Sequence, residues 1–207
     1  MTSIRFHEGD ISLADTKRYA GAIAIDTETL GLVPRRDRLC VVQLSPGDGT
    51  ADVIRIAAGQ TSAPNIEALL ADPTHEKIFH YGRFDIAVLF HTFGISTNPV
   101  FCTKIASRLT RTYTERHGLK DNLRELLDVD ISKAQQQTDW AADVLSQAQL
   151  EYAASDVLHL HALRDKLVTR LIRDKRMELA EACFAFLPTR AKLDLLGWGE
   201  TDIFAHS

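Results

Sequence analysis

Two acidic side chains stand at the end of an apolar run near the start of the chain. Residues 22–25 are Ala-Ile-Ala-Ile, and Asp26, Thr27 and Glu28 follow directly. Side chains alternate between the faces of an extended chain, so Asp26 and Glu28 share one face and Thr27 lies on the other. A bound cation would relieve the repulsion between two such anions, and carboxylate oxygens favour Mg²⁺ or Mn²⁺. Taken alone, the pair is equally compatible with two interpretations, a metal site or two ordinary acids on the surface.

Two further acids and a tyrosine lie where predicted helices present them. Asp85 is at the start of a predicted helix over 84–93, where the helix dipole favours an anion. Tyr152 and Asp156 are four residues apart in a later helix and therefore share one face. Separately, Asp85 would be a helix-start acid, and Tyr152 with Asp156 a pair at the solvent edge. The combination with the first two acids favours an active site.

The elements that must position these residues begin with a sheet. The first three predicted strands are joined by short connections, including the turn Pro46-Gly47-Asp48-Gly49, which suggests an antiparallel meander. Apolar runs and turn residues predict five strands, at 22–28, 39–45, 51–56, 77–81 and 99–102.

Helical periodicity separates and follows these strands. Ser146 and Gln149 form a predicted capping box, from which one helix or a pair of helices runs past Arg170. Gly94 is expected to close the helix over 84–93. Other helical segments are predicted at 10–20, from 63, at 103–109, 118–127 and 178–196. Mixed strands followed by helices predict a layered α/β or α+β domain.

Length and composition are those of an ordinary globular protein. The chain has 207 residues, of which 45% are hydrophobic and 25% charged, enough for one domain with a full core. Residues 1–8 lack the pattern of a secretory signal, and no apolar stretch is long enough to span a bilayer. We therefore expect a cytoplasmic protein. Cys40, Cys102 and Cys183 are widely separated, so we expect reduced thiols rather than disulfides or a zinc site.

The net charge of −4 gives the chain no overall electrostatic reason to coat long nucleic acid or a membrane. A small nucleic-acid substrate remains compatible, because a site that clamps a few phosphates needs only local basic groups. Each basic cluster taken singly is more typical of a solvated face. The clusters are Arg35, Arg36 and Arg38, and then Arg108, Arg111, Arg116, His117 and Lys120.

Three separated motifs carry a family resemblance. Asp26-Thr27-Glu28, the segment ending at Asp85, and Tyr152-Ala153-Ala154-Ser155-Asp156 resemble the three motifs of the DEDDy 3′-to-5′ exonucleases. The stretch 133–157 is especially similar to ribonuclease D, and the likeness covers about residues 20–170. Given its length, the chain looks most like the nanoRNase C group of short, oligoribonuclease-type enzymes.

The resemblance implies a ribonuclease H-like fold, an α/β five-stranded mixed sheet flanked by helices. It implies one exonuclease domain over 1–207, with the motifs in a core of about 20–170 and a helical extension over 171–207. Two Mg²⁺ or Mn²⁺ ions would flank the scissile phosphate, and Tyr152 would orient the attacking water. The implied metal ligands are Asp26, Glu28, Asp85 and Asp156.

The resemblance also implies residues that bind substrate. Leu32 matches the family's apolar wedge between the last two bases. His80 lies where related enzymes contact the terminal nucleotide, although a structural histidine is an equal alternative. Thr27, inside the first motif, is a third candidate for substrate binding. Cys102-Thr103 and Asp143-Val144 depart from the ribonuclease D pattern, which puts its detailed substrate contacts in doubt.

The expected function is metal-dependent 3′-to-5′ hydrolysis of short single-stranded RNA, down to dinucleotides, releasing nucleoside 5′-monophosphates. One alternative is 3′ trimming of tRNA or other stable RNA in the manner of ribonuclease D. Another is a catalytically silent module that binds nucleic acid. The resemblance further implies a homo-oligomer, with a ring of eight as one form. The segment 187–204 is then a candidate interface, or it packs back on its own core.

Overall fold

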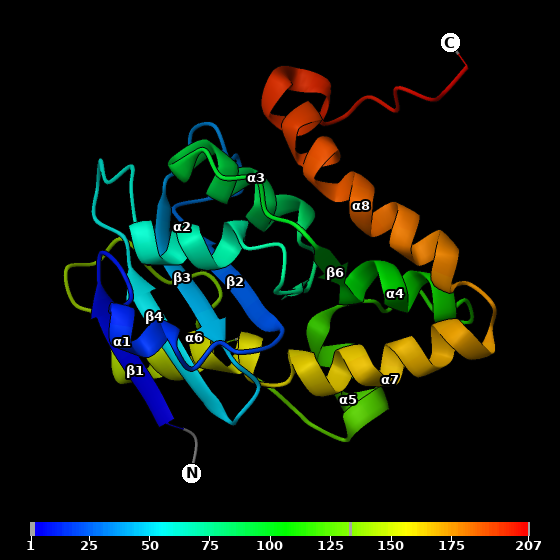
Figure 1. Cartoon of the computed structure of the whole chain (residues 1–207), viewed down its shortest axis with the longest axis horizontal. Helices are drawn as coiled ribbons and strands as arrows, with labels where there is room; N and C mark the ends of the chain where they lie inside the picture. Colours follow the sequence, from blue (N-terminus) through cyan, green and yellow to red (C-terminus); the bar gives the residue numbers. More distant parts are fainter. Residues whose placement is uncertain (1–2, 133, 207) are drawn as a thin grey trace.

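A computed structural model describes residues 3–132 and 134–206. Met1 and Thr2, part of the segment that lacks a signal pattern, lie outside these ranges, as does Lys133 at the start of the ribonuclease D-like stretch. A single mixed sheet forms the centre, with helices packed on both of its faces and beyond one edge (Figure 1). The predicted α/β class is confirmed.

The sheet has the order β1-β4-β3-β2-β5-β6. Strands β2, β3 and β4 are antiparallel neighbours, which confirms the predicted meander. Strands β5 and β6 continue the sheet parallel to β2, and β1 lies parallel to β4. The strands are β1 (Ser3–Glu8), β2 (Ile23–Thr29), β3 (Leu39–Ser45), β4 (Thr50–Arg55), β5 (Lys77–Phe79) and β6 (Val100–Cys102).

The prediction of five strands was wrong, because it omitted β1. This edge strand is largely exposed and carries little apolar signal. It pairs with β4 from Ser3 to Glu8, and the buried Asp52 of β4 adds a side-chain contact, since its Oδ1 lies 2.7 Å from Nε2 of His7. The other carboxylate oxygen of Asp52 accepts hydrogen bonds from Arg18 and Tyr19, each at 2.5 Å. A buried acid that needs partners thus draws the first segment onto the sheet.

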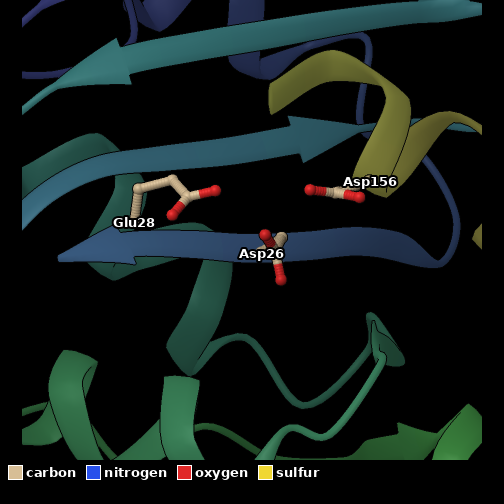
Figure 2. Close-up of side chains that lie close together, drawn as sticks. All are labelled: Asp26, Glu28 and Asp156. Carbon is tan, nitrogen blue, oxygen red and sulfur yellow. The ribbon is translucent and has the colours of Figure 1, made fainter. Parts of the chain in front are cut away.

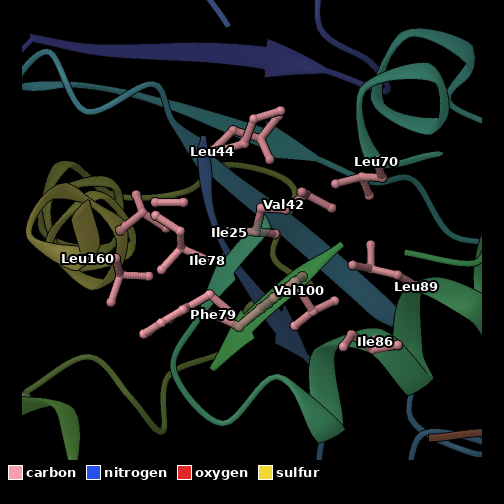
Figure 3. Close-up of a cluster of buried hydrophobic side chains, with 14 of the residues drawn as sticks. Ile25, Val42, Leu44, Leu70, Ile78, Phe79, Ile86, Leu89, Val100 and Leu160 are labelled. Carbon is pink, nitrogen blue, oxygen red and sulfur yellow. The ribbon is translucent and has the colours of Figure 1, made fainter. Parts of the chain in front are cut away.

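The helices cover the sheet unequally. Helices α2 and α3 lie over one face and share a core with β2 and β3 that includes Leu70, Leu89 and Val42 (Figures 1 and 3). Helix α6 packs against β2, β3 and β4 over a smaller cluster around Trp140 and Leu145. The helices are α1 (Leu13–Thr16), α2 (Pro64–Ala71), α3 (Arg83–Phe93), α4 (Thr103–Thr110), α5 (Leu119–Leu127), α6 (Gln147–Leu158), α7 (Leu160–Arg173) and α8 (Met177–Leu193), with a π-helical turn η1 (Asp194–Trp198).

The predicted helix ends are present. Ser146 and Gln149 form the reciprocal capping box, with Oε1 of Gln149 accepting from the Ser146 N–H at 3.0 Å. Gly94 ends α3 in the left-handed conformation, φ 71°. The chain after Ser146 forms a pair of helices, α6 and α7, separated at His159. Cys40 and Cys102 are buried and Cys183 half-buried, and all three are free thiols.

The C-terminal helix α8 packs back on the domain against α3, α4 and β6. Arg83 at the start of α3 donates two hydrogen bonds to the Asp194 carboxylate, at 2.5 and 2.7 Å, and Arg190 donates a third at 2.8 Å. Beyond η1 the chain extends away from the sheet, as the red segment in Figure 1 shows, while the Phe204 ring packs against Phe186 of α8 with the ring centroids 6.0 Å apart. Across residues 3–132 and 134–206, every helix is too short or too polar to cross a membrane.

Candidate active site

Three carboxylates meet between β2 and α6. Asp26 and Glu28 project from β2, and Asp156 from α6 points toward them (Figure 2). One oxygen atom of each carboxylate lies within 4.8 Å of the other two. The alternation of β2 places Asp26 and Glu28 on one face, and α6 packs across that face, so sequence segments 130 residues apart come together.

Asp85, the fourth predicted acid, lies beside this group rather than in it. It is in the first turn of α3 and is 4% exposed. The Thr27 hydroxyl donates a hydrogen bond to its Oδ1 atom at 2.6 Å. Gly82 makes the approach possible, because a Cβ atom there would lie 2.7 Å from Cβ of Phe79 at the end of β5. Asp85 is thereby tied to the strand that carries Asp26 and Glu28.

The acids lie close together and repel one another, and partial burial limits their hydration. Burial, and then the charges of Asp85, Asp156 and Glu28, raise the pKa of Asp26 well above its ordinary value. Burial and the neighbouring Asp156 and Asp85 raise the pKa of Glu28 to about 9. Burial also raises the pKa of Asp85 to about 7, against the Thr27 hydrogen bond. The raised pKa values mean that the charged carboxylates are disfavoured unless a cation compensates them. Because all the ligand atoms are oxygens, a hard divalent cation such as Mg²⁺ fits the site.

The acids line an open pocket of about 670 Å³. Leu32 and His80, both candidates for substrate binding, also line it, as does Thr27. The Leu32 side chain is 86% exposed. The Nδ1 atom of His80 lies 2.8 Å from the Thr103 hydroxyl, which itself donates to the Phe79 carbonyl at 3.1 Å. Because the Thr103 hydroxyl proton is used on the Phe79 carbonyl, Nδ1 of His80 is the donor to Thr103.

Tyr152 lines the pocket on the side of α6. Its ring packs against Trp140, with the ring centroids 5.9 Å apart, and Trp140 is buried. Burial and the nearby Asp156, Glu28 and Asp26 all raise the pKa of Tyr152. The phenol therefore stays protonated around neutral pH and can donate a hydrogen bond.

Several pocket residues were absent from the predicted set. Lys104 lies 4.2 Å from the ring centre of Tyr81, which has a positive φ of 71°. Lys104 is the second residue of α4 and Lys120 the second residue of α5, so the packing of both helices beside the site brings these cations to it. The sequence places Lys120 in a basic cluster, but it gives no signal that either lysine faces the acids. The additional lining residues include Tyr81, Phe84, Lys104, Lys120, Gln136, Gln137 and Trp140.

Comparisons with known proteins identify the family. A model of the 3′-5′ exonuclease family matches residues 11–172. A nuclease solved in its apo form is 81% identical, with a TM-score of 0.99 and 100% of both chains covered. NrnC of Brucella melitensis bound to pGG is 67% identical, with a TM-score of 0.96 and 100% of both chains covered. The same protein with bound Mg²⁺ is 66% identical, with a TM-score of 0.95, 99% of this chain and 100% of that one covered.

Ribonuclease D of Granulibacter bethesdensis is 35% identical over 176 residues, which are 85% of this chain and 44% of that protein. The chain thus spans less than half the length of this relative. The family resemblance drawn from the three motifs is confirmed, as is the ribonuclease H-like fold. The protein belongs to the 3′-5′ exonuclease family and is one of its ribonuclease D-like members.

Proposed function

We propose that the protein is a metal-dependent 3′-to-5′ exoribonuclease that degrades short oligoribonucleotides, including dinucleotides, to nucleoside 5′-monophosphates. The observation that carries this proposal is the carboxylate group of Asp26, Glu28 and Asp156 inside a pocket that also presents the exposed Leu32. Full-length similarity to a protein solved with Mg²⁺ and with the dinucleotide pGG supports both the cofactor and the substrate class.

Asp26, Glu28, Asp85 and Asp156 would hold two divalent cations, Mg²⁺ or Mn²⁺. When bound, such ions lower the pKa of water and neutralise charge on the scissile phosphate and the leaving 3′ oxygen. The raised pKa values of Glu28 and Asp85 support this assignment, because like charges this close together are stabilised when a cation or a proton compensates them. Thr27 would hold the Asp85 carboxylate in position through its hydroxyl.

The other predicted residues act on the substrate. Tyr152 would orient the attacking water by donating a hydrogen bond, since its raised pKa makes it a poor base. Leu32 would insert between the last two bases, and His80 would contact the terminal nucleotide. Thr27 lines the same pocket and would lie beside the terminal nucleotide.

A short substrate suits the pocket and the charge. A volume of about 670 Å³ is in the range of small-ligand sites. The described lining includes two lysines, Lys104 and Lys120, and the chain carries a net charge of −4. A long strand would instead call for an extended basic groove with stacking platforms.

The proposal extends to assembly. We propose one exonuclease domain over 1–207 that forms a homo-oligomer, for which a ring of eight is one form. Apolar side chains exposed near the C-terminus, Leu196, Trp198 and Phe204, support this, being 69%, 45% and 78% exposed. Light scattering coupled to size exclusion tests it, and a monomer would refute it.

The decisive experiment uses 5′-labelled RNA of two to twenty nucleotides with Mg²⁺ or Mn²⁺. We expect the dinucleotide to be converted to monomers fastest, and Asp26→Asn to abolish conversion at every length. Preference for long structured RNA would instead support trimming in the manner of ribonuclease D. Binding without turnover at any length would support a silent module and refute both enzyme functions.

A further inference from the structure

The loop that joins β2 to β3 carries Leu32 on the rim of the pocket. Its base is closed by the Leu30 N–H, which donates to the Arg38 carbonyl at 3.2 Å. Leu32 itself is 86% exposed, so side-chain packing within the chain contributes little to its position. Whatever orients Leu32 must therefore act on the backbone of its neighbours.

Asp37, a residue that our proposed mechanism does not use, makes this contact. It is 8% exposed, although it lies in a surface loop. Its Oδ2 atom accepts a hydrogen bond from the Val33 N–H at 2.9 Å, and the Arg36 guanidinium donates to both carboxylate oxygens, at 2.7 and 2.9 Å. The Arg36 and Val33 hydrogen bonds hold the pKa of Asp37 below its usual range, so the carboxylate stays charged.

Gly31 contacts the same carboxylate from the other side of Leu32. A Cβ atom at residue 31 would lie 2.4 Å from Oδ2 and 2.9 Å from Cγ of Asp37, too close for any real pair of atoms. The Val33 hydrogen bond and the low exposure of Asp37 resist movement of the carboxylate, and the Arg36 side chain, which is itself exposed, adds two further hydrogen bonds. Asp37 therefore hydrogen-bonds residue 33 and leaves no room for a side chain at residue 31, so the conformations of both residues that flank Leu32 depend on where this carboxylate lies.

We propose that Asp37 and Gly31 are positioning residues that hold the backbone on both sides of Leu32, so that its side chain is presented to the bases of a short RNA before the RNA binds. This inference rests on the proposed function. Pre-ordering the loop lowers the entropy that substrate binding would otherwise lose. Neither residue needs to touch the substrate, since both act through Leu32.

Limited proteolysis tests whether Asp37 and Gly31 hold the loop, and it does not depend on catalytic activity. Arg35, Arg36 and Arg38 place three trypsin sites in the loop itself. Gly31→Ala leaves the sequence around these sites intact, and we expect it to accelerate cleavage there by about tenfold, the effect of a loss of about 1.4 kcal/mol in loop ordering. Gly21→Ala is the matched control, because a Cβ atom at residue 21 meets nothing within 4 Å. Equal cleavage of Gly31→Ala and wild type would overturn the proposal.

Kinetics on pGG with Mg²⁺ test the coupling to Leu32. We expect Asp37→Asn to lower kcat/KM about tenfold in the wild-type background but less than about twofold in a Leu32→Ala background, as for two residues acting as one unit. The increase in melting temperature on adding Mg²⁺ should stay unchanged. Asp48→Ala serves as the control, since it removes an acid that accepts hydrogen bonds from Thr50 in another loop.

The outcomes separate this inference from the proposed function. Equal losses from Asp37→Asn in both backgrounds would overturn the coupling to Leu32. A wild-type protein inactive on pGG would refute the proposed function, while the trypsin rates would still decide whether Gly31 and Asp37 hold the loop. Circular dichroism detects a Gly31→Ala variant that fails to fold. In that case Asp37→Asn tests whether the carboxylate holds the loop, through the rate of trypsin cleavage after Arg35 and through the double-mutant cycle with Leu32→Ala.

Discussion

The Thr27 hydroxyl lies 2.6 Å from Oδ1 of Asp85 and donates a hydrogen bond to it. This bond joins β2 to the first turn of α3, and both partners are buried. Thr27→Val keeps the shape of the side chain and removes the donor. A hydrogen bond to a charged group is worth about 1.5–3 kcal/mol, so we expect kcat to fall about 10- to 100-fold. Thr27→Ser should restore most of the activity, and equal activity of the valine variant and wild type would contradict the positioning role.

The metal assignment predicts a stability change that does not depend on turnover. We expect Mg²⁺ to raise the melting temperature of the wild-type protein, since an ion that binds only the folded state stabilises it. Asp26→Asn should melt higher than wild type in EDTA, because it removes one of several repelling buried charges, and it should respond weakly to Mg²⁺. Differential scanning calorimetry measures both effects. An undiminished Mg²⁺ response in Asp26→Asn would argue against Asp26 as a ligand.

The same acids predict how stability depends on pH in EDTA. The pKa of Glu28 is raised to about 9 and that of Asp85 to about 7, so the folded protein binds more protons than the unfolded chain between about pH 4 and these values. The free energy of unfolding should therefore fall as pH rises through this window. Saturating Mg²⁺ should reduce the slope. Chemical denaturation at pH 5, 7 and 9 measures it, and identical slopes with and without Mg²⁺ would contradict the prediction.

Much of this site was accessible from the sequence because its signals are local. The capping box at Ser146, the glycine at 94 and the alternation around Asp26 each depend on a few adjacent residues, and the structure contains all three features. The strand β1 was missed because its position depends on pairing with β4 and on the buried Asp52 of that strand, some 45 residues later. A partner that distant leaves no periodicity in the strand itself.

The residues that line the pocket also depend on contacts between segments distant in the sequence, which the sequence does not reveal. Lys104 and Lys120 face the site only because α4 and α5 pack beside it, and Asp37 reads in sequence as one more acid in a basic loop. The placement of Asp85 against Thr27 was also beyond sequence reasoning. It follows from the Thr27 hydrogen bond and from the close contact of Gly82 with Phe79, neither of which has a sequence signature.

Tyr152→Phe separates catalysis from metal binding. Because its pKa is raised, the phenol contributes as a hydrogen-bond donor rather than as a base. We expect kcat to fall by about 100-fold, the lower end of the usual contribution of a proton-handling group, with the Mg²⁺-dependent melting shift retained. Tyr113→Phe is a matched control, because Tyr113 is 66% exposed and contacts Glu125 instead of the pocket. Retention of full activity by Tyr152→Phe would exclude the water-orienting role.

Substitution of Lys77 is expected to lower the stability of the fold without changing the catalytic activity of the folded protein. It is fully buried at the start of β5, beside the strand that carries Asp26, and its Nζ atom donates to the backbone carbonyls of Asp72, His75 and Asn98. Lys77→Met would leave these three acceptors without their donor. We expect the free energy of unfolding to fall by about 2–4 kcal/mol.

The control for Lys77→Met is Lys166→Met, on the exposed surface of α7, which should change the free energy of unfolding by less than about 0.5 kcal/mol. Activity per folded molecule should be preserved in both variants, because Lys77 lies outside the pocket lining. Urea denaturation gives the stability and pGG hydrolysis gives the activity. A Lys77→Met protein as stable as wild type would mean that water or a shifted backbone satisfies the three carbonyls, and that Lys77 does not anchor this edge of the sheet.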